Sequence, residues 1–316
     1  MAVNWKYVQM LDQRGWLRPG VRILDIGSSN LYSAEAEGLR AFLAKYNPAM
    51  PAADAAKTAE RLAEGSFVHP VTGATNKAFV GELFEAAGMV YQAFDIANGY
   101  RTEILDFNRQ DLPAKHRGAY DVILNFGTTE HIVHQFNSFK IIHEAAHVGT
   151  VTWHQLPAIG FVDHCYFAYR PRFFFEIAAF NGYDLVDFWY GGGGSSKLLD
   201  IVADYGAYFP ILTEYARNPA GAPQPHENVT IPNYCANVMY RKLKDTPFMP
   251  SVECSTSVGE VPEEVKSAYR PGAEAKAEPI PHVVAAVVTP APSGGALRAL
   301  KNVLRPVVKA LRGAPR

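Results

Sequence analysis

Short apolar runs alternate with segments of helical spacing along the first 190 residues of the chain. The strand-like runs cover 21–26, 89–95, 104–108, 120–127 and 150–154, and helical spacing marks 5–16, 137–146 and a segment beginning at Pro171. Two later runs, 183–190 and 234–241, have the alternation of an antiparallel pair. This order predicts an α/β fold with a mostly parallel sheet, helices on both faces and a reversed strand at the end.

The first apolar run ends in a turn that discriminates between cofactor types. Asp25 lies at the strand end, and Gly27, Ser28 and Ser29 form the turn. A dinucleotide pyrophosphate requires glycines and free backbone N–H groups, which a carboxylate in the turn opposes, and no Gly-x-Gly-x-x-Gly motif is present. S-adenosylmethionine has no phosphate and carries an ammonium and a sulfonium, which a carboxylate attracts. The turn therefore disfavours NAD-dependent chemistry.

Residues 25–29 resemble the first motif of the class I S-adenosylmethionine-dependent methyltransferases, Asp/Glu-x-Gly-x-Gly, with serine at the second glycine. Three later features follow in the family's order. Asp95 closes the second strand, Asn108–Pro113 resembles the Asp-x-x-x-Leu-Pro segment that covers the adenine, and Thr128–His131 resembles the Glu-His pair after strand four. The resemblance covers about residues 20–190. It implies the Rossmann-like class I methyltransferase fold, with a seven-stranded sheet and a helical insertion after strand one.

The resemblance also implies a cofactor site for S-adenosylmethionine. The predicted contacts are Asp25, Gly27, Ser28 and Ser29 for the methionine end, Asp95 and Ile96 for the ribose, Asn108 for the adenine, and Asn125 and Gly127 for the floor beneath the sulfonium. Asp95 follows Gly27 by 68 positions, whereas a ribose acid usually follows by about 20. The gap indicates an insertion at about 46–88, which would either roof the cofactor or be a structural elaboration.

Histidines follow the ends of successive predicted strands and are candidates for proton transfer. A histidine near its ordinary pKa can take a proton from a hydroxyl or a protonated amine. We predict that His131 is the general base, that Glu130 orients it or the acceptor, and that His154 and His164 are further catalytic candidates. The alternative for each histidine is a structural role.

A metal site is a second interpretation of the same region. Glu130, His131, His134 and Asp163 offer ligand atoms, and one helical turn separates the first two histidines. The three cysteines are widely spaced and contain no Cys-x-x-Cys pair, which excludes the common zinc and disulfide frameworks. Nothing in the spacing fixes a ligand set, so we expect no metal.

Composition and charge limit the partners. A net charge of −1 does not provide the excess of positive charge that nucleic-acid binding requires. Residues 1–12 are charged where a signal peptide is apolar, so we expect a cytoplasmic protein. The predicted organisation is a methyltransferase domain at 1–244, a Pro/Ala-rich disordered linker at 245–295 and a basic amphipathic tail at 296–316. The tail would contact a membrane surface, dock a partner or remain solvated.

The sequence thus predicts a methyltransferase that uses S-adenosylmethionine to methylate an oxygen or nitrogen of a small molecule or sugar-containing glycan precursor. The competing hypothesis is a non-catalytic methyltransferase-like scaffold that docks through its basic tail. Ser29 and Asn108, which stand where the family has Gly and Asp, keep that alternative open.

Overall fold

The computed structural model describes residues 2–67, 77–161, 164–197, 230–251 and 267. The chain divides into two units, Met1–Ala275 and Lys276–Arg316, and all described residues belong to the first. The predicted tail at 296–316 and most of the predicted linker lie outside the described residues. Among the described helices, none has the length and hydropathy that a membrane crossing requires.

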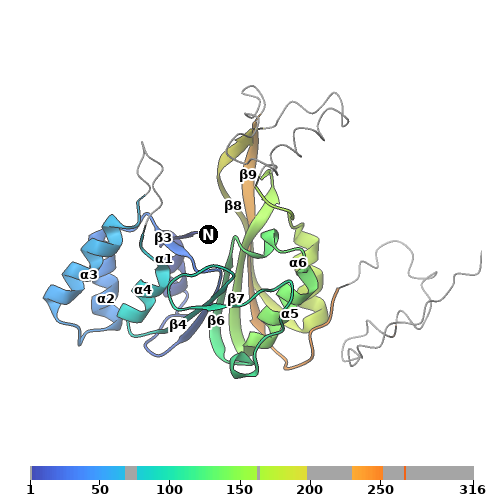
Figure 1. The fold of residues 1–316 in the computed structure, drawn as a ribbon, viewed down its shortest axis with the longest axis horizontal. Helices are drawn as coiled ribbons and strands as arrows, with labels where there is room; N and C mark the ends of the chain where they lie inside the picture. The colour runs from blue at the N-terminus through green and yellow to red at the C-terminus, as the bar shows by residue number, and fades with distance from the viewer. Residues whose placement is uncertain (1, 68–76, 162–163, 198–229, 252–266, 268–316) are drawn as a thin grey trace, which may run out of the picture. The chain divides into compact units, whose positions relative to one another are not determined.

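A seven-stranded sheet forms the centre of the fold (Figure 1), in the order β5-β4-β2-β6-β7-β9-β8. The strands are β2 (Arg22–Ile26), β4 (Val90–Asp95), β5 (Thr102–Ile104), β6 (Tyr120–Phe126), β7 (Ala146–Ile159), β8 (Tyr183–Lys197) and β9 (Thr230–Lys242). Neighbours from β5 to β7 are parallel, and β9 runs antiparallel to both β7 and β8. The mostly parallel sheet with a reversed last strand is therefore confirmed.

Helices cover both faces of this sheet. They are α1 (Trp5–Gln13), α2 (Ala36–Tyr46), α3 (Ala52–Glu64), α4 (Val80–Ala86), α5 (Gln135–Ala145) and α6 (Pro171–Asn181), with short 3-10 turns η1 (Ala114–His116) and η2 (Thr129–His131). Alternate strand residues face opposite cores, because successive side chains of a strand point to opposite sides. Ile23 packs with α1, α2 and α4, whereas Leu24 packs with Ile141 and Ile142 of α5.

The chain between β2 and β4 contains the predicted helical insertion. A small parallel sheet of β1 (Ala2–Asn4) and β3 (Asn30–Tyr32) precedes α2, and α3 and α4 lie within the predicted range of 46–88. Gly81 brings α4 against the sheet so closely that an added Cβ would lie 2.3 Å from the ring of Tyr91. The insertion is thus packed tightly on the core.

The structure corrects three predicted boundaries. The third strand is Thr102–Ile104, so most of the predicted strand 104–108 is a loop. The predicted strand 183–190 continues through the glycines at 191–194 as β8, and Gly191 and Gly192 pair with β9. The packed domain extends beyond the predicted end at 244, since Phe248 and Met249 are buried.

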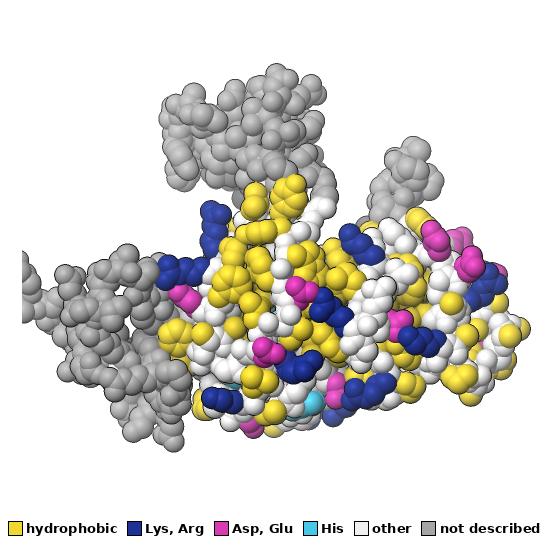
Figure 2. Space-filling model, turned by 180° about the vertical axis from the view of Figure 1, so that it is seen from behind, with side chains coloured by type: hydrophobic (Ala, Val, Ile, Leu, Met, Phe, Trp, Pro, Cys, Tyr) yellow, Lys and Arg dark blue, Asp and Glu magenta, His cyan; other side chains and the backbone are white. Residues whose placement is uncertain are grey.

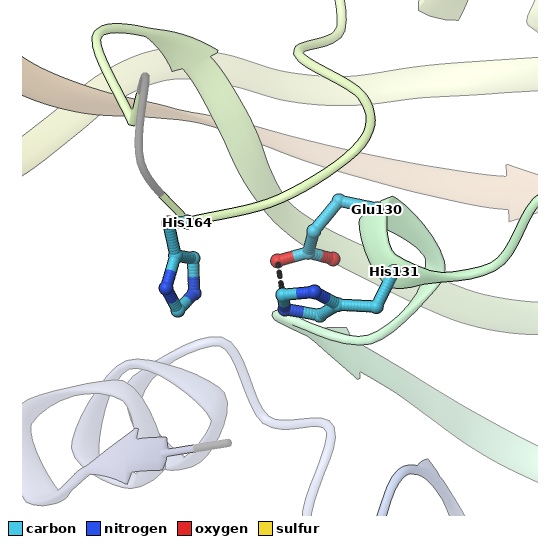
Figure 3. Close-up of side chains that lie close together, drawn as sticks. All are labelled: Glu130, His131 and His164. Atoms are coloured by element: carbon cyan, nitrogen blue, oxygen red, sulfur yellow. Dashed lines mark ion pairs between the residues drawn. The ribbon is translucent and has the colours of Figure 1, made fainter. Parts of the chain in front are cut away.

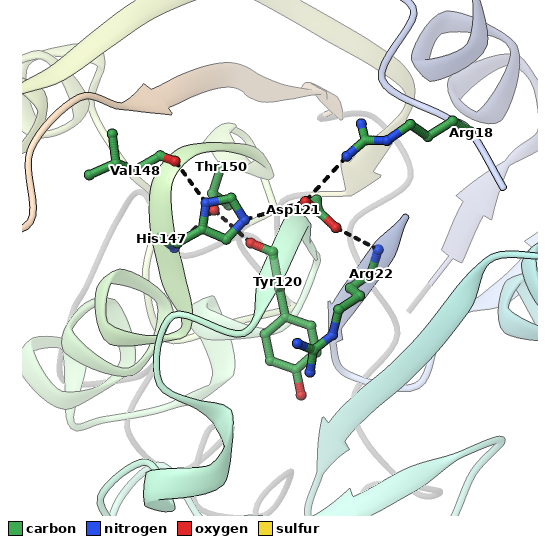
Figure 4. A network of polar contacts seen from close by, with 7 residues as sticks. All are labelled: Arg18, Arg22, Tyr120, Asp121, His147, Val148 and Thr150. Carbon is green, nitrogen blue, oxygen red and sulfur yellow. Dashed lines mark hydrogen bonds and ion pairs between the residues drawn. The ribbon is translucent and has the colours of Figure 1, made fainter. Parts of the chain in front are cut away.

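The amino ends of three strands are joined by a polar network around Asp121 (Figure 4). Its carboxylate accepts hydrogen bonds from the backbone N–H of Arg22 at 2.8 Å, from the Arg18 guanidinium at 3.4 Å and from His147 Nε2 at 3.3 Å. Thr150 Oγ1 donates to the Tyr120 carbonyl at 2.6 Å. These bonds fix β2, β6 and β7 at the edge opposite their carboxyl ends, so Asp121 has a structural role.

The hairpin of β8 and β9 extends above the helices in Figure 1. From behind, hydrophobic side chains gather over this part of the molecule (Figure 2). Leu185, Tyr190 and Tyr234 of the two strands are exposed. The hairpin therefore carries apolar surface outside the core.

Candidate functional site

A cavity of about 660 Å³ opens at the carboxyl ends of the parallel strands. Its walls are formed by β4, β6, β7, β9, η2, the loop after β5 and the loop after β7. The residues that line it are Phe94, Asp95, Ile96, Leu105, Asp106, Phe107, Asn108, Phe126, Gly127, Thr128, Glu130, His131, Ile132, Gln155, Pro157, Phe161, His164 and Cys235. This is the edge at which open α/β sheets bind ligands. Among the described residues of 46–88, none lines the cavity, which favours the structural role for the insertion.

Asp25 lies beneath the turn after β2 and does not line the cavity. The side chain is fully buried, and its carboxylate accepts hydrogen bonds from Ser29 N at 2.8 Å, Ser29 Oγ at 3.0 Å and Tyr91 Oη at 2.7 Å. Burial raises the pKa of Asp25 to about 7 against these hydrogen bonds, which lower it. The predicted direct contact of Asp25 and Ser29 with a cofactor is therefore corrected to a role in shaping the turn.

Asp95 joins that turn to the cavity wall. Its half-buried carboxylate accepts hydrogen bonds from the backbone N–H groups of Ser28 and Ala97, each at 3.1 Å. Ser28 Oγ in turn accepts the N–H of Tyr100 at 3.0 Å, so Ser28 faces the next loop and, like Gly27, does not line the cavity. Asp95 and its exposed neighbour Ile96 do line it.

The loop after β5 contributes two polar residues to the cavity. Asn108 is exposed, and its Oδ1 accepts the backbone N–H of His134 at 3.0 Å. Asp106 Oδ1 accepts the N–H of Asn108 at 2.8 Å, and both residues line the cavity. Asn108 was predicted from its place in the segment 108–113, whereas Asp106 was missed because it precedes that segment and was taken as part of a strand that in fact ends at Ile104.

Glu130, His131 and His164 meet at another part of the wall (Figure 3). The first two belong to η2, and His164 comes from the loop after β7. His131 Nε2 lies 4.0 Å from Glu130 Oε1, and the rings of His131 and His164 meet edge to face at 5.0 Å. The structure thus brings together three of the four predicted catalytic residues.

The carboxylate of Glu130 is buried with one oxygen unpaired. The side chain is 1% exposed, and Oε2 has no hydrogen-bond partner among the described residues. Burial raises the pKa of Glu130 to about 7. Burial also lowers the pKa of His131, with a further contribution from neighbouring His164. The imidazole of His131 is therefore neutral near pH 7 and able to accept a proton.

His154 and Asn125 lie in the core. His154 is 2% exposed, and its Nδ1 is 3.0 Å from the side-chain amide of Asn125, which is also buried. Burial lowers the pKa of His154 to about 3. Neither residue lines the cavity. The prediction of a catalytic His154 is therefore corrected, and the predicted floor position is filled by Gly127, which lines the cavity, rather than by Asn125.

The charged residues of the cavity have one sign. Asp95, Asp106 and Glu130 supply carboxylates, and no Lys or Arg is present among the described residues that line it. Low-dielectric walls focus the field of such a cluster. The cavity therefore favours a cationic or uncharged ligand over a phosphorylated one.

No protein-family model matches the sequence, and no curated protein is similar to it. Solved structures with a similar fold include an S-adenosylmethionine-dependent methyltransferase from Archaeoglobus fulgidus, at 11% identity over 73% of this chain and 91% of that one, with a TM-score of 0.36. Phosphoethanolamine N-methyltransferase 2 of Haemonchus contortus, in complex with S-adenosyl-L-methionine, is 13% identical over 76% of this chain and 53% of that one, with a TM-score of 0.34.

The fold of the chain follows from its own strand order. The order β5-β4-β2-β6-β7-β9-β8, with β9 reversed, is the sheet that the class I methyltransferase resemblance implies. The chain therefore has a Rossmann-like α/β fold around a seven-stranded, mostly parallel sheet.

Proposed function

We propose that the protein transfers a methyl group from S-adenosylmethionine to an oxygen or nitrogen of a small molecule. One observation carries the proposal: the cavity at the carboxyl ends of β4, β6 and β7 is lined by carboxylates and by no described Lys or Arg. This charge suits a cofactor with a sulfonium and no phosphate. A volume of about 660 Å³ is within the range of small-molecule sites.

The cofactor half of the cavity would be formed by the loops after β4 and β5. The Asp95 carboxylate can accept hydrogen bonds from ribose hydroxyls, while Ile96 offers an apolar face. Asp106 and Asn108 have oxygens that can accept an adenine amine. S-adenosylmethionine, when bound, supplies an electrophilic methyl group on a sulfonium, and the protein then has only to orient the acceptor and remove its proton.

The acceptor half would be formed by η2 and the loop after β7. Neutral His131 can take the acceptor's proton, and Glu130 can stabilise the imidazolium that results. His164 closes the same wall and can bind the acceptor. These placements support an enzyme over a non-catalytic scaffold. A sugar-containing precursor as acceptor, a cytoplasmic location and membrane contact through 296–316 remain predictions.

Calorimetric titration with S-adenosylhomocysteine tests this function without an acceptor. We expect Kd on the order of micromolar for the wild type. Asp95→Ala should weaken binding about 30-fold, because hydrogen bonds to a charged group are lost. Asp111→Ala, an exposed acid outside the cavity, is the matched control and should bind like the wild type. Absence of binding to the wild type would refute the proposed function.

Gly99→Ala should weaken S-adenosylhomocysteine binding about tenfold and cost about 1–3 kcal/mol of stability. An added Cβ would lie 2.2 Å from Ser28 Oγ and would displace the loop that follows Asp95. Gly149→Ala, which places a side chain at a backbone φ of +97° and outside the cavity, is the control for a glycine replacement that costs stability elsewhere. Equal affinities for the two variants would contradict the predicted link between this loop and the cofactor.

A further inference from the structure

We propose that Glu130, His131 and His164 form a binding site for one divalent transition-metal ion at the acceptor end of the cavity. One ligand atom from each of the three side chains lies within 4.8 Å of the other two. These three ligands differ from the four residues considered in the sequence analysis, which included His134 and Asp163 in place of His164. Asp163 lies outside the described residues, and His134 does not belong to this cluster.

The backbone holds the two contributing segments together. The carbonyl oxygen of Glu130 accepts hydrogen bonds from the N–H groups of Tyr166 and Phe167, at 3.1 and 3.2 Å. These bonds anchor the loop that carries His164 to η2, which carries the other two side chains. In Figure 3 the Glu130 carboxylate lies over the His131 ring, and the ring of His164 faces this pair from the opposite segment. The cluster is therefore built from two elements with a fixed relation.

The unpaired oxygen of Glu130 is a second, independent observation. Oε2 is buried and has no hydrogen-bond partner among the described residues, although buried polar atoms are nearly always paired. The described residues around the cavity provide no Lys or Arg to balance the three carboxylates. A dication bound by the Glu130 carboxylate, whose Oε1 faces His131, would compensate the burial of this group and offset the negative charge of the cavity.

The donor set determines the class of ion. Two imidazole nitrogens and one carboxylate oxygen are the ligands of three-residue sites for zinc and ferrous iron, which leave coordination positions open. Metal–ligand bonds of about 2.1 Å place tetrahedral ligand atoms about 3.4 Å apart. The ligand atoms must therefore move closer by up to about 1.4 Å from their 4.8 Å limit. Both histidines are exposed, and their rings can turn inward without disturbing the core.

An ion in this position would face the cavity with open positions. If the proposed methyl transfer is correct, on which this step rests, those positions would bind the acceptor oxygen or nitrogen and lower its pKa. The histidines would then hold the ion, and the acceptor's proton would be released to water rather than taken by His131.

The test uses the tag-free full chain, stripped of metal and titrated with zinc chloride against a chromophoric chelator. The wild type should bind one Zn²⁺, and Co²⁺ in its place should give visible absorption bands of a site with nitrogen ligands. His164→Ala should weaken Zn²⁺ binding at least about 100-fold, because one of three ligands is lost. Since His164 is exposed in a loop, this variant should fold like the wild type.

His134→Ala is the matched control, because its exposed side chain lies three positions from His131 and outside the cluster. It should bind Zn²⁺ as tightly as the wild type. Equal Zn²⁺ affinity in the wild type and His164→Ala, or no stoichiometric binding in the wild type, overturns the metal site. Titration of the same samples with S-adenosylhomocysteine separates the two proposals, since loss of that binding alone refutes the methyltransferase function and leaves the metal site intact.

Discussion

Asp25→Asn is expected to make the protein more stable than the wild type by about 4 kcal/mol at pH 8, and by only about 2 kcal/mol at pH 5. Burial raises the pKa of Asp25 from 3.8 to about 7 in the folded protein. The folded state therefore keeps a proton that the unfolded state releases between these values. The stability associated with that proton is present below pH 3.8 and is lost as the pH rises to about 7.

Asparagine can keep the hydrogen bonds of the buried site. Its carbonyl oxygen can accept from Ser29 N and Tyr91 Oη, as Asp25 Oδ2 does, and its amide can donate to Ser29 Oγ. The variant thus imitates the protonated acid at every pH. The pKa of Glu130 is also raised to about 7, so Glu130 likewise makes the protein less stable as the pH rises. This contribution is the same in the wild type and the variant, so it does not affect their difference.

Urea unfolding of wild type and variant at pH 5, 6.5 and 8 measures this difference. Asp54→Asn, in the exposed first turn of α3, is the matched control and should follow the wild type at each pH. If Asp25→Asn and wild type have parallel pH profiles, Asp25 is ionised in the folded protein and the buried network is wrong.

Much of the fold was predictable because strand periodicity is a local signal. The continuous apolar runs of β2 and β6, which are buried on both faces, and the reversed pair of β8 and β9 are visible in the sequence. The strand after β4 was misplaced because Leu105 and Phe107 are buried in the core from a loop, which imitates a strand pattern. The glycines of β8 are typical of a loop, yet their pairing with β9 holds them in a strand despite the low strand propensity of glycine.

The site was predicted less completely because it depends on where strands end. His154 was placed at the end of a strand that continues to Ile159, so it lies in mid-strand and in the core, while Gln155 and Pro157 reach the cavity. Asp25 was recognised by its motif, but its bond to Tyr91 joins residues 66 positions apart. Such long-range partners have no local signature, and neither does the approach of His164 to Glu130.

Trp153→Ala should destabilise the protein by about 3–5 kcal/mol, the largest loss expected for one side chain here. Trp153 on β7 is fully buried and forms the contact between the sheet and α1. Its ring lies 5.3 Å from Tyr7, 5.0 Å from Phe126 and 5.5 Å from Trp189. Alanine would leave a large cavity among these rings and would remove the donor of the 3.3 Å hydrogen bond to buried Asn237.

Urea unfolding of Trp153→Ala, Trp153→Phe and Trp16→Ala separates the causes. Phenylalanine keeps an aromatic ring and loses only volume and the indole donor, so its loss should be about half that of alanine. Trp16 is only partly buried, so its replacement should cost about 1–2 kcal/mol. A loss below about 1 kcal/mol for Trp153→Ala would contradict the packing of α1 on β7. Because Phe126 also lines the cavity, Trp153→Ala should weaken S-adenosylhomocysteine binding even where the protein remains folded.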